Sequence, residues 1–412
     1  MTGPFSPFQL AGLSLRNRII KTATFEGMSP NGCVSEALIE HHRALAAGGV
    51  AMTTVAYCAV EPDGRTFRDQ LHMRPELLPD LRALSRAVHA EGAAASLQLG
   101  HCGAFSNNQA LKRRRPMGPS RALNLVGALS GRVLADAMTE TEIEEVTAAF
   151  VRAAGLAREA DFDAIELQLG HGYLLSQFLS PGTNARRDRF GGSLANRARF
   201  ALAVVERVRA ALPPEMPVLA KVNLRDGYRG GLEIDESIQL ARELEARGVN
   251  ALVLSGGFVS RNPFYLFRGE RPLRQMIAVE KRLAQKLALA VFGPALIRPY
   301  AFEPLYFLPL ARELRRAVRM PLVLLGGIKS RGDLDTAMRE GFELCAMGRA
   351  LIHDPSLIAK YAAGAARDSG CVPCNQCVAE MDREGGVCCP KVPAQLAERA
   401  VAVRRARSSG ES

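Results

Sequence analysis

Short apolar runs rich in Val, Ile and Leu alternate with longer segments in which apolar residues recur every three or four positions. The short runs predict β-strands at 18–24, 50–55, 93–99, 164–169, 218–222, 251–254, 322–325 and 344–347. The longer segments predict helices at 35–47, 76–91, 141–160, 194–211, 235–247, 302–319, 331–339 and 355–362. Thr139 and Thr141 at the start of one of these helices, and Asp235 at the start of another, are the candidate N-caps.

The regular alternation of strand and helix is typical of a parallel sheet in the α/β class. Eight such units fit a closed (β/α)8 TIM barrel with long active-site loops, which we predict for residues 1–365. An open dinucleotide-binding sheet usually carries a Gly-rich fingerprint after its first strand, whereas here that strand leads into TATFEGM. Residues 366–412 are predicted to form a short Cys-rich extension and a polar tail.

Three predicted loops are long enough to carry function, at 101–138, 170–193 and 255–301. The last contains Phe258, Phe264, Tyr265 and Phe267. These aromatic residues favour a lid over the substrate side of the barrel, and the alternative is an apolar patch for contact with a second copy in a homo-oligomer.

The net charge of +11 raises the question of a nucleic-acid or membrane-surface partner. The basic run 112–115 lacks interleaved aromatic residues, so we expect a surface loop and no nucleic acid or membrane partner. The most apolar segment, 287–297, is too short to span a bilayer and contains Gly293 and Pro294. Without a recognisable export signal, we expect a cytoplasmic location and cysteines that serve as thiols or metal ligands.

Polar side chains gather after the fourth predicted strand, where Gln168, His171 and Tyr173 would reach the barrel mouth. After strands seven and eight come Gly326-Gly327 and Gly348-Arg349. Exposed backbone N–H groups, helix N-termini and a guanidinium at this place in a barrel predict a phosphate site.

The segment ELQLGHGYLLSQFLSPGTNARRDRFGGSLANRARF resembles the old yellow enzyme family pattern H-x-x-[HN]-G-Y-L-x-x-Q-F-L-S-P followed by N-x-R-x-D-x-[YF]-G-G-S-L-x-N-R. LRNRIIKTATFEGM, QLGHCG, LLGGIKS and AMGRALIHDP extend the resemblance in the same order over residues 5–355. It implies an FMN-dependent NAD(P)H:flavin oxidoreductase that passes hydride to an α,β-unsaturated carbonyl compound.

The resemblance also implies roles for individual residues. Gln168 and His171 would hydrogen-bond the carbonyl oxygen of the acceptor, and Tyr173 would protonate its α-carbon. Gln168 departs from the family pattern, and because an amide carries no charge, stabilisation of the oxyanion would depend chiefly on His171.

Further residues are implied to hold the flavin. Gln98 would pair with the polar edge of the ring, and Lys221, at the family's Arg position, would favour the reduced form. The backbone of Ala23 and Thr24 would lie beneath the ring, and Gly326, Gly327, Gly348 and Arg349 would hold the FMN phosphate.

Five cysteines crowd the end of the chain. Cys371, Cys374, Cys377 and then Cys388 or Cys389 resemble the ferredoxin-like motif of the dienoyl-CoA reductase and trimethylamine dehydrogenase branch, although the third cysteine stands one residue early. A [4Fe-4S] cluster, a structural zinc and free thiols are the open alternatives. With a cluster, an electron-donor protein could serve as a partner.

One alternative of another class remains. A (β/α)8 lyase or aldolase could form a Schiff base at Lys221 and hold a substrate phosphate on the glycine loops.

Overall fold

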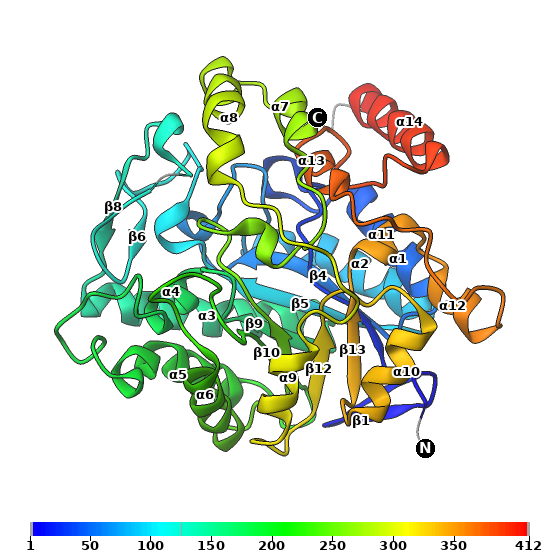
Figure 1. Ribbon diagram of the computed structural model, residues 1–412, viewed down its shortest axis with the longest axis horizontal. Coiled ribbons are helices and arrows are strands. Elements are labelled where there is room, and N and C mark those ends of the chain that lie inside the picture. The colour runs from blue at the N-terminus through cyan, green and yellow to red at the C-terminus, as the bar shows by residue number, and fades with distance from the viewer. Residues whose placement is uncertain (1–2, 125, 410–412) are drawn as a thin grey trace.

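The computed structural model describes residues 3–124 and 126–409. Eight strands form a closed barrel in the order β10-β11-β12-β13-β3-β4-β5-β9, and every pair is parallel (Figure 1). They are β3 (Ile19–Lys21), β4 (Met52–Ala59), β5 (Ala94–Gly100), β9 (Ala164–Gln168), β10 (Val218–Asn223), β11 (Ala251–Ser255), β12 (Leu322–Leu325) and β13 (Leu344–Met347). Each overlaps a predicted strand, so the predicted TIM barrel is confirmed.

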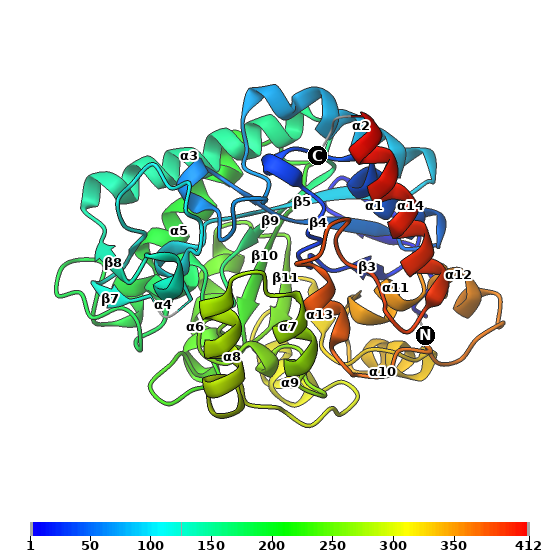
Figure 2. The same cartoon turned by 90° about the horizontal axis from the view of Figure 1, so that it is seen from above.

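Helices surround the barrel, as the view from above shows (Figure 2). They are α1 (Glu36–Ala47), α2 (Leu78–Ala90), α3 (Glu140–Glu159), α5 (Leu194–Ala211), α6 (Ile234–Ala246), α9 (Leu308–Arg315), α10 (Arg331–Arg339), α11 (Arg349–His353) and α12 (Leu357–Ala362). Of the two candidates for the N-cap of α3, Thr139 is the N-cap and forms a capping box with Glu142. The prediction for Thr141 was wrong, because Thr141 lies within the first turn of α3. The prediction for Asp235 was wrong, because α6 begins one residue earlier and Glu233 is its N-cap.

The predicted helix 302–319 is shorter than its apolar periodicity suggested. α9 begins only at Leu308, and Leu305 before it has a positive φ of 55° that no helix contains. The irregular chain there packs against the glycine turn after β12, where a Cβ on Gly327 would lie 2.7 Å from the Glu303 carbonyl oxygen. Contact with this turn therefore overrides the helical pattern.

The two ends of the barrel differ. At the lower end in Figure 1 the hairpin of β1 (Phe8–Leu10) and β2 (Leu13–Leu15) places Leu10 and Leu15 in one cluster with apolar side chains of the barrel strands. A second, larger core lies between the strands and the surrounding helices. With one end closed by apolar packing, the loops at the carboxyl ends of the strands remain for chemistry.

Several smaller elements gather at that upper end. They are a sheet of β6 (Met117–Gly118), β7 (Ala122–Leu123) and β8 (Leu134–Ala137), and helices α4 (Leu174–Leu179), α7 (Leu273–Val279), α8 (Leu283–Leu296), α13 (Gln376–Glu380) and α14 (Pro393–Ser409). Short 3-10 helices span Pro30–Gly32, Pro62–Gly64, Pro75–Leu77, Gly103–Phe105, Ala128–Ser130 and Pro263–Tyr265. None of the helices within the described ranges combines the length and apolar character needed to span a bilayer.

The Cys-rich extension packs against the barrel. The Ser369 N–H donates to the Lys329 carbonyl at 2.9 Å, and the Val387 N–H donates to the Glu26 carbonyl at 2.7 Å. Part of the predicted polar tail forms α14. A division of the chain near residue 365 remains a prediction.

Candidate active site

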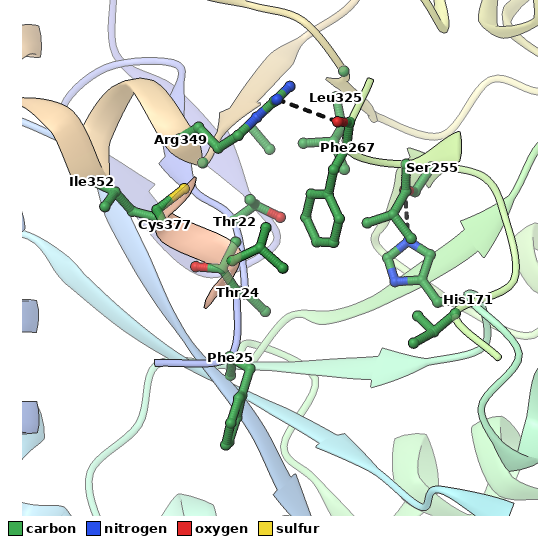
Figure 3. A pocket seen from close by; sticks show the side chains of 18 of the residues that line it. Thr22, Thr24, Phe25, His171, Ser255, Phe267, Leu325, Arg349, Ile352 and Cys377 are labelled. Atoms are coloured by element: carbon green, nitrogen blue, oxygen red, sulfur yellow. Dashed lines mark hydrogen bonds between the residues drawn. The ribbon is translucent and has the colours of Figure 1, made fainter. Parts of the chain in front are cut away.

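A cavity of about 240 Å³ opens at the barrel mouth. Its wall contains all three predicted catalytic residues and all eight predicted flavin-site residues: Gln168, His171, Tyr173, Ala23, Thr24, Gln98, Lys221, Gly326, Gly327, Gly348 and Arg349. They come from loops and strands that are far apart in the sequence, and Figure 3 shows Thr24, His171 and Arg349 on different sides of the same space. The barrel therefore brings the predicted site together.

The floor of the cavity carries a buried ion pair. Lys221 Nζ lies 2.8 Å from Glu166 Oε1, and the two side chains are only 1% and 2% exposed. Glu166 also accepts a hydrogen bond from Gln98 Nε2 at 2.5 Å, and Lys221 donates to Thr22 Oγ1 at 3.1 Å. Lys221 is thus a fixed cation at the bottom of the cavity.

Sequence reasoning missed Glu166. It lies two residues before Gln168 on β9, and because side chains alternate along a strand, both point to the same face. The spacing of Glu166 and Gln168 along the strand was the signal that the sequence offered. In the structure Glu166 also lies opposite Gln98 in the register of β5 and β9.

His171 is held from two sides. Its Nε2 lies 2.7 Å from Ser255 Oγ at the end of β11, and its backbone N–H donates to Asn223 Oδ1 at 2.9 Å (Figure 3). Its φ of +61° lies in the left-handed region, a strained conformation that these contacts hold in place. Neither Ser255 nor Asn223 was predicted, because only the closed barrel brings their strands to His171.

The environment of His171 keeps the imidazole neutral. Burial, and after it the positive charge of Lys221, lowers the pKa of His171 to about 3. Its Nδ1 lies 3.3 Å from the Gln168 amide nitrogen. At neutral pH the two side chains can therefore act as neutral hydrogen-bonding groups, and neither carries positive charge.

Tyr173 lines the cavity. Its ring packs edge-on against Tyr57 and Phe105, with centroids 4.8 and 5.2 Å away. Burial raises the pKa of Tyr173, so the hydroxyl keeps its proton at neutral pH. Among the residues the structure describes, this hydroxyl has no hydrogen-bond partner, which leaves it free to donate to a bound molecule.

The glycine turns have the backbone that a phosphate site requires. Gly326 and Gly327 have φ values of 106° and 77°, which favour glycine. A Cβ on Gly348 would lie 3.3 Å from Thr22 Cγ2. Arg349 also lines the cavity, and one of its amino groups donates to the Arg268 carbonyl at 2.9 Å and to Asn375 Oδ1.

These features fit FMN. The buried Thr24 Oγ1 and Gln168 Oε1 atoms have no partner in the described part of the chain, and both side chains line the cavity. A ligand with a polar edge would satisfy such atoms. With the cation of Lys221 and the glycine turns, the cavity offers what a flavin ring and its phosphate need.

The cysteines form a neighbouring cluster. Cys371, Cys374, Cys377 and Cys389 line one small cavity that shares Arg349 with the first, whereas Cys388 is not part of its wall. Burial raises the pKa of Cys371 to about 11 and that of Cys377 to about 12. No three His, Cys, Asp or Glu side chains of the described ranges form a group that could hold a single metal ion.

The four aromatic residues of the predicted lid lie in the first part of its loop, and the lid itself remains a prediction. Phe267 lines the cavity, and Phe258, Phe264 and Tyr265 are buried nearby in the protein. Helix α8, which lies in the same loop, contributes no residue to the cavity wall among the residues described.

Comparison with known proteins agrees with this site. Residues 4–261 match the NADH:flavin oxidoreductase / NADH oxidase family. The chain is 46% identical over 377 residues to the 4,4'-dithiodibutanoate disulfide reductase of Rhodococcus erythropolis, a match that covers 91% of this chain and 92% of that protein. The resemblance to an FMN oxidoreductase family is confirmed.

Two further similarities extend the comparison. A metal reductase of Desulforamulus reducens is 32% identical over 93% of this chain, which spans about half (52%) of that relative's length. The structure of the old yellow enzyme homologue from Zymomonas mobilis shares the fold, with a TM-score of 0.71 at 19% identity over 94% of this chain and 98% of that one.

The buried ion pair can be tested by charge removal. In a Lys221→Met variant Glu166 would lose its partner in a water-free site, and we expect the free energy of unfolding to fall by about 3–5 kcal/mol. Urea unfolding of the variant measures the loss. The double variant Glu166→Gln/Lys221→Met leaves no buried charge and should recover most of it; equal losses would contradict the ion-pair argument.

The neutral state of His171 predicts a pH dependence of stability. Because the folded pKa of about 3 lies below the ordinary 6.5, the unfolded chain binds a proton between these values that the folded chain excludes. Protonation of His171 in the unfolded chain therefore lowers the free energy of unfolding as pH falls through this window. A His171→Asn variant lacks this contribution, so its stability relative to the parent should rise from pH 7 to pH 4 in urea titrations. A constant difference would show that His171 titrates normally.

Proposed function

This chain belongs to the NADH:flavin oxidoreductase / NADH oxidase family, and from that premise we propose that it is an FMN-dependent NAD(P)H reductase of electron-poor C=C bonds conjugated to a carbonyl group. The observation that carries this proposal is the Tyr173 hydroxyl, protonated and without a partner among the described residues, in one cavity with Gln168 and His171. Reduction of such a bond needs one hydride and one proton. Tyr173 is placed to supply the proton.

We assign the binding of FMN to the residues predicted from the sequence. When bound, FMN would accept hydride from NAD(P)H and deliver it to the acceptor. Gln98, Lys221 and the backbone of Ala23 and Thr24 would hold the ring. The turns at Gly326, Gly327 and Gly348 would hold the phosphate together with Arg349, whose contacts to Arg268 and Asn375 fix the guanidinium in place.

The acceptor carbonyl would lie against Gln168 and His171. When the Ser255 hydroxyl donates to His171 Nε2, the imidazole carries its proton on Nδ1, the nitrogen beside Gln168. Two neutral N–H donors would then stabilise the developing enolate oxygen. Ser255 acts in this scheme as a positioning residue, because it selects the tautomer of His171.

A second acceptor class is favoured by the relative that is 46% identical, which is named as a disulfide reductase. The balanced reaction is NAD(P)H + H⁺ + RSSR → NAD(P)⁺ + 2 RSH. Cleavage of the S–S bond releases a thiolate, and the Tyr173 hydroxyl is equally placed to protonate it. An organic disulfide is therefore our second candidate acceptor.

The lyase or aldolase alternative finds no support. A Schiff-base lysine attacks a carbonyl through a free amine, whereas Lys221 is engaged by the carboxylate of Glu166 and by Thr22. The assigned family consists of oxidoreductases.

We also propose a [4Fe-4S] cluster held by Cys371, Cys374, Cys377 and Cys389. Support comes from the donor set, because four sulfur-bearing side chains line one cavity, and thiolates are the usual ligands of such clusters. Our prediction from the sequence placed Cys388 first as the fourth ligand, and the position of Cys389 in the cavity wall favours the other choice.

Replacement of Tyr173 separates the two half-reactions. In Tyr173→Phe, reduction of the flavin by NAD(P)H should be unchanged, because that step needs no proton from the protein. Reoxidation by an enone such as cyclohexenone should slow by about a hundredfold. Stopped-flow absorbance of the flavin measures both steps, with Tyr228→Phe, whose hydroxyl pairs with Ser180 away from the cavity, as the matched control.

Stopped-flow absorbance of the flavin also compares enones with organic disulfides as acceptors. If an aromatic or aliphatic disulfide reoxidises the flavin faster than any enone, the second candidate replaces the first. Equal slowing of both half-reactions in Tyr173→Phe would contradict its role as proton donor.

The cluster proposal is tested by iron and acid-labile sulfide content after anaerobic purification. Cys389→Ser should abolish both, whereas Cys388→Ser should retain them, because only Cys389 lines the cavity. Protein that contains no iron, or an equal loss in the two variants, would contradict the assignment.

A further inference from the structure

Helix α8 is unusually apolar for an exposed helix. Of its fourteen residues only Gln285 and Lys286 are polar, and only Gly293 is buried. Five of its large apolar side chains are more than half exposed: Leu283 (72%), Leu287 (57%), Val291 (66%), Phe292 (59%) and Leu296 (67%). A helix that is apolar on most sides normally lies in a protein core or in lipid. In this structure α8 is not enclosed by the protein core.

Basic residues surround this helix. Residues 271–298 contain six Lys or Arg and a single acidic residue, Glu280. Lys281, Arg282 and Lys286 stand at one end of α8 and Arg298 follows the other, and none of them forms an ion pair within the described ranges. The apolar surface is thus framed by positive charge.

A basic loop that has no role in the proposed catalysis lies beside α8. Residues 112–132 contain six Lys or Arg and no acidic residue. Ser130 Oγ of this loop lies 2.9 Å from the side-chain amide of Gln285 and also contacts Arg282, while Arg132 donates to the Gln109 carbonyl at 2.8 Å. The loop also exposes Leu123 (68%) and contributes to the same surface.

We propose that this surface, formed by α8 and by residues 112–124 and 126–132 of the loop, docks on an anionic lipid membrane. Apolar side chains framed by Lys and Arg match an interface in which acyl chains lie beneath negatively charged headgroups. Fourteen helical residues extend about 21 Å, too short to cross the hydrocarbon core but suited to lying in its interface. From the sequence alone we expected no membrane partner, because the basic run 112–115 lacks interleaved aromatic residues and the apolar segment 287–297 is too short to span a bilayer.

A second copy of the chain fits this surface less well. In a twofold dimer the same surface of both copies would meet, so the basic residues of one copy would face those of the other. Within the described ranges only Arg113, Arg115 and Arg121 of the twelve have acidic partners, Glu142 and Asp136. Like charges placed together oppose association. A negatively charged lipid surface instead neutralises them, and this difference decides between the two occupants.

The surface stands at the same end of the barrel as the cavity. α8 belongs to the loop after β11, and Figure 1 shows it at the upper end with α7 and α13. Docking there would bring the cavity mouth toward the bilayer, so acceptors dissolved in lipid would reach the site directly. The docking surface itself does not depend on the identity of the acceptor.

The test is flotation of the flavin-loaded protein with liposomes. We expect binding to phosphatidylcholine vesicles with about 30% phosphatidylglycerol and little binding to phosphatidylcholine alone, with loss at high salt. Leu287→Gln/Phe292→Gln should weaken binding by about tenfold without a change of charge. Lys281→Gln/Lys286→Gln should weaken it by a similar factor.

A matched control removes two positive charges elsewhere. Arg86→Gln/Arg242→Gln, on exposed positions of α2 and α6, should bind as the parent does. If this control loses as much binding as the Lys281/Lys286 variant, attraction is merely a matter of net charge and the proposal is overturned. Absence of binding to anionic vesicles, or a dimer in solution that Leu287→Gln/Phe292→Gln dissociates, would also overturn it.

The absence of tryptophan from the sequence provides a direct readout of insertion. A Phe292→Trp variant carries a single indole, whose emission should shift to the blue on anionic vesicles. The emission of an Arg242→Trp variant should show no shift. Emission that is unchanged at position 292 while the protein floats with vesicles would show that α8 is not the element that enters the interface, and would contradict the proposal.

Discussion

Two opposite charges that are almost shielded from water lie at the centre of this structure. Lys221 and Glu166 are 2.8 Å apart on neighbouring strands, and Gln98 on a third strand completes the group. Either charge alone would be expensive to bury, so each requires the other. Well-packed apolar side chains would stabilise the barrel at least as well. The pair is therefore best explained by what it supplies to the cavity, a cation whose position is fixed.

Most of the barrel could be predicted because its signals are local. Each strand is a short apolar run between helical patterns, and all eight overlapped their predictions. The residues that line the cavity were found for a related reason, since strand ends in a barrel meet at one mouth. What could not be predicted depends on tertiary contacts: the ion pair of Glu166, the hold of Ser255 on His171, and the interruption before α9 at Leu305.

The upper end of the barrel shows the same limit. Gly293 and Pro294 suggested a break within the segment 287–297, yet α8 runs through both to Leu296. The proline is tolerated near the last turn of the helix, and Arg271 donates to its carbonyl at 2.8 Å. A basic run and an apolar run 170 positions apart gave no sign of belonging to one surface. Ser130 brings them together only in the folded chain.

The Cys-rich extension contributes residues to the cavity wall, among them Cys371 and Cys377. The side-chain amide of Asn375 donates from Nδ2 to the backbone carbonyls of Phe267 and Glu270, and its Oδ1 accepts from Arg349. One residue therefore connects the lid, the glycine turn after β13 and the cysteine-lined cavity. A change in that cavity would be transmitted to the guanidinium beside the proposed phosphate position, because Arg349 lines both cavities.

The fixed cation also governs the chemistry proposed above it. The charge of Lys221 adds to burial in lowering the pKa of His171. A residue that would favour negative charge on a bound flavin therefore also keeps the neighbouring imidazole neutral. With Gln168 as an amide, the acceptor meets neutral donors only. An acceptor must then be activated by its own electron-withdrawing groups or by a good leaving group such as a thiolate. Strongly polarised enones and organic disulfides both meet that condition, which is the physical reason for proposing these two classes for one cavity.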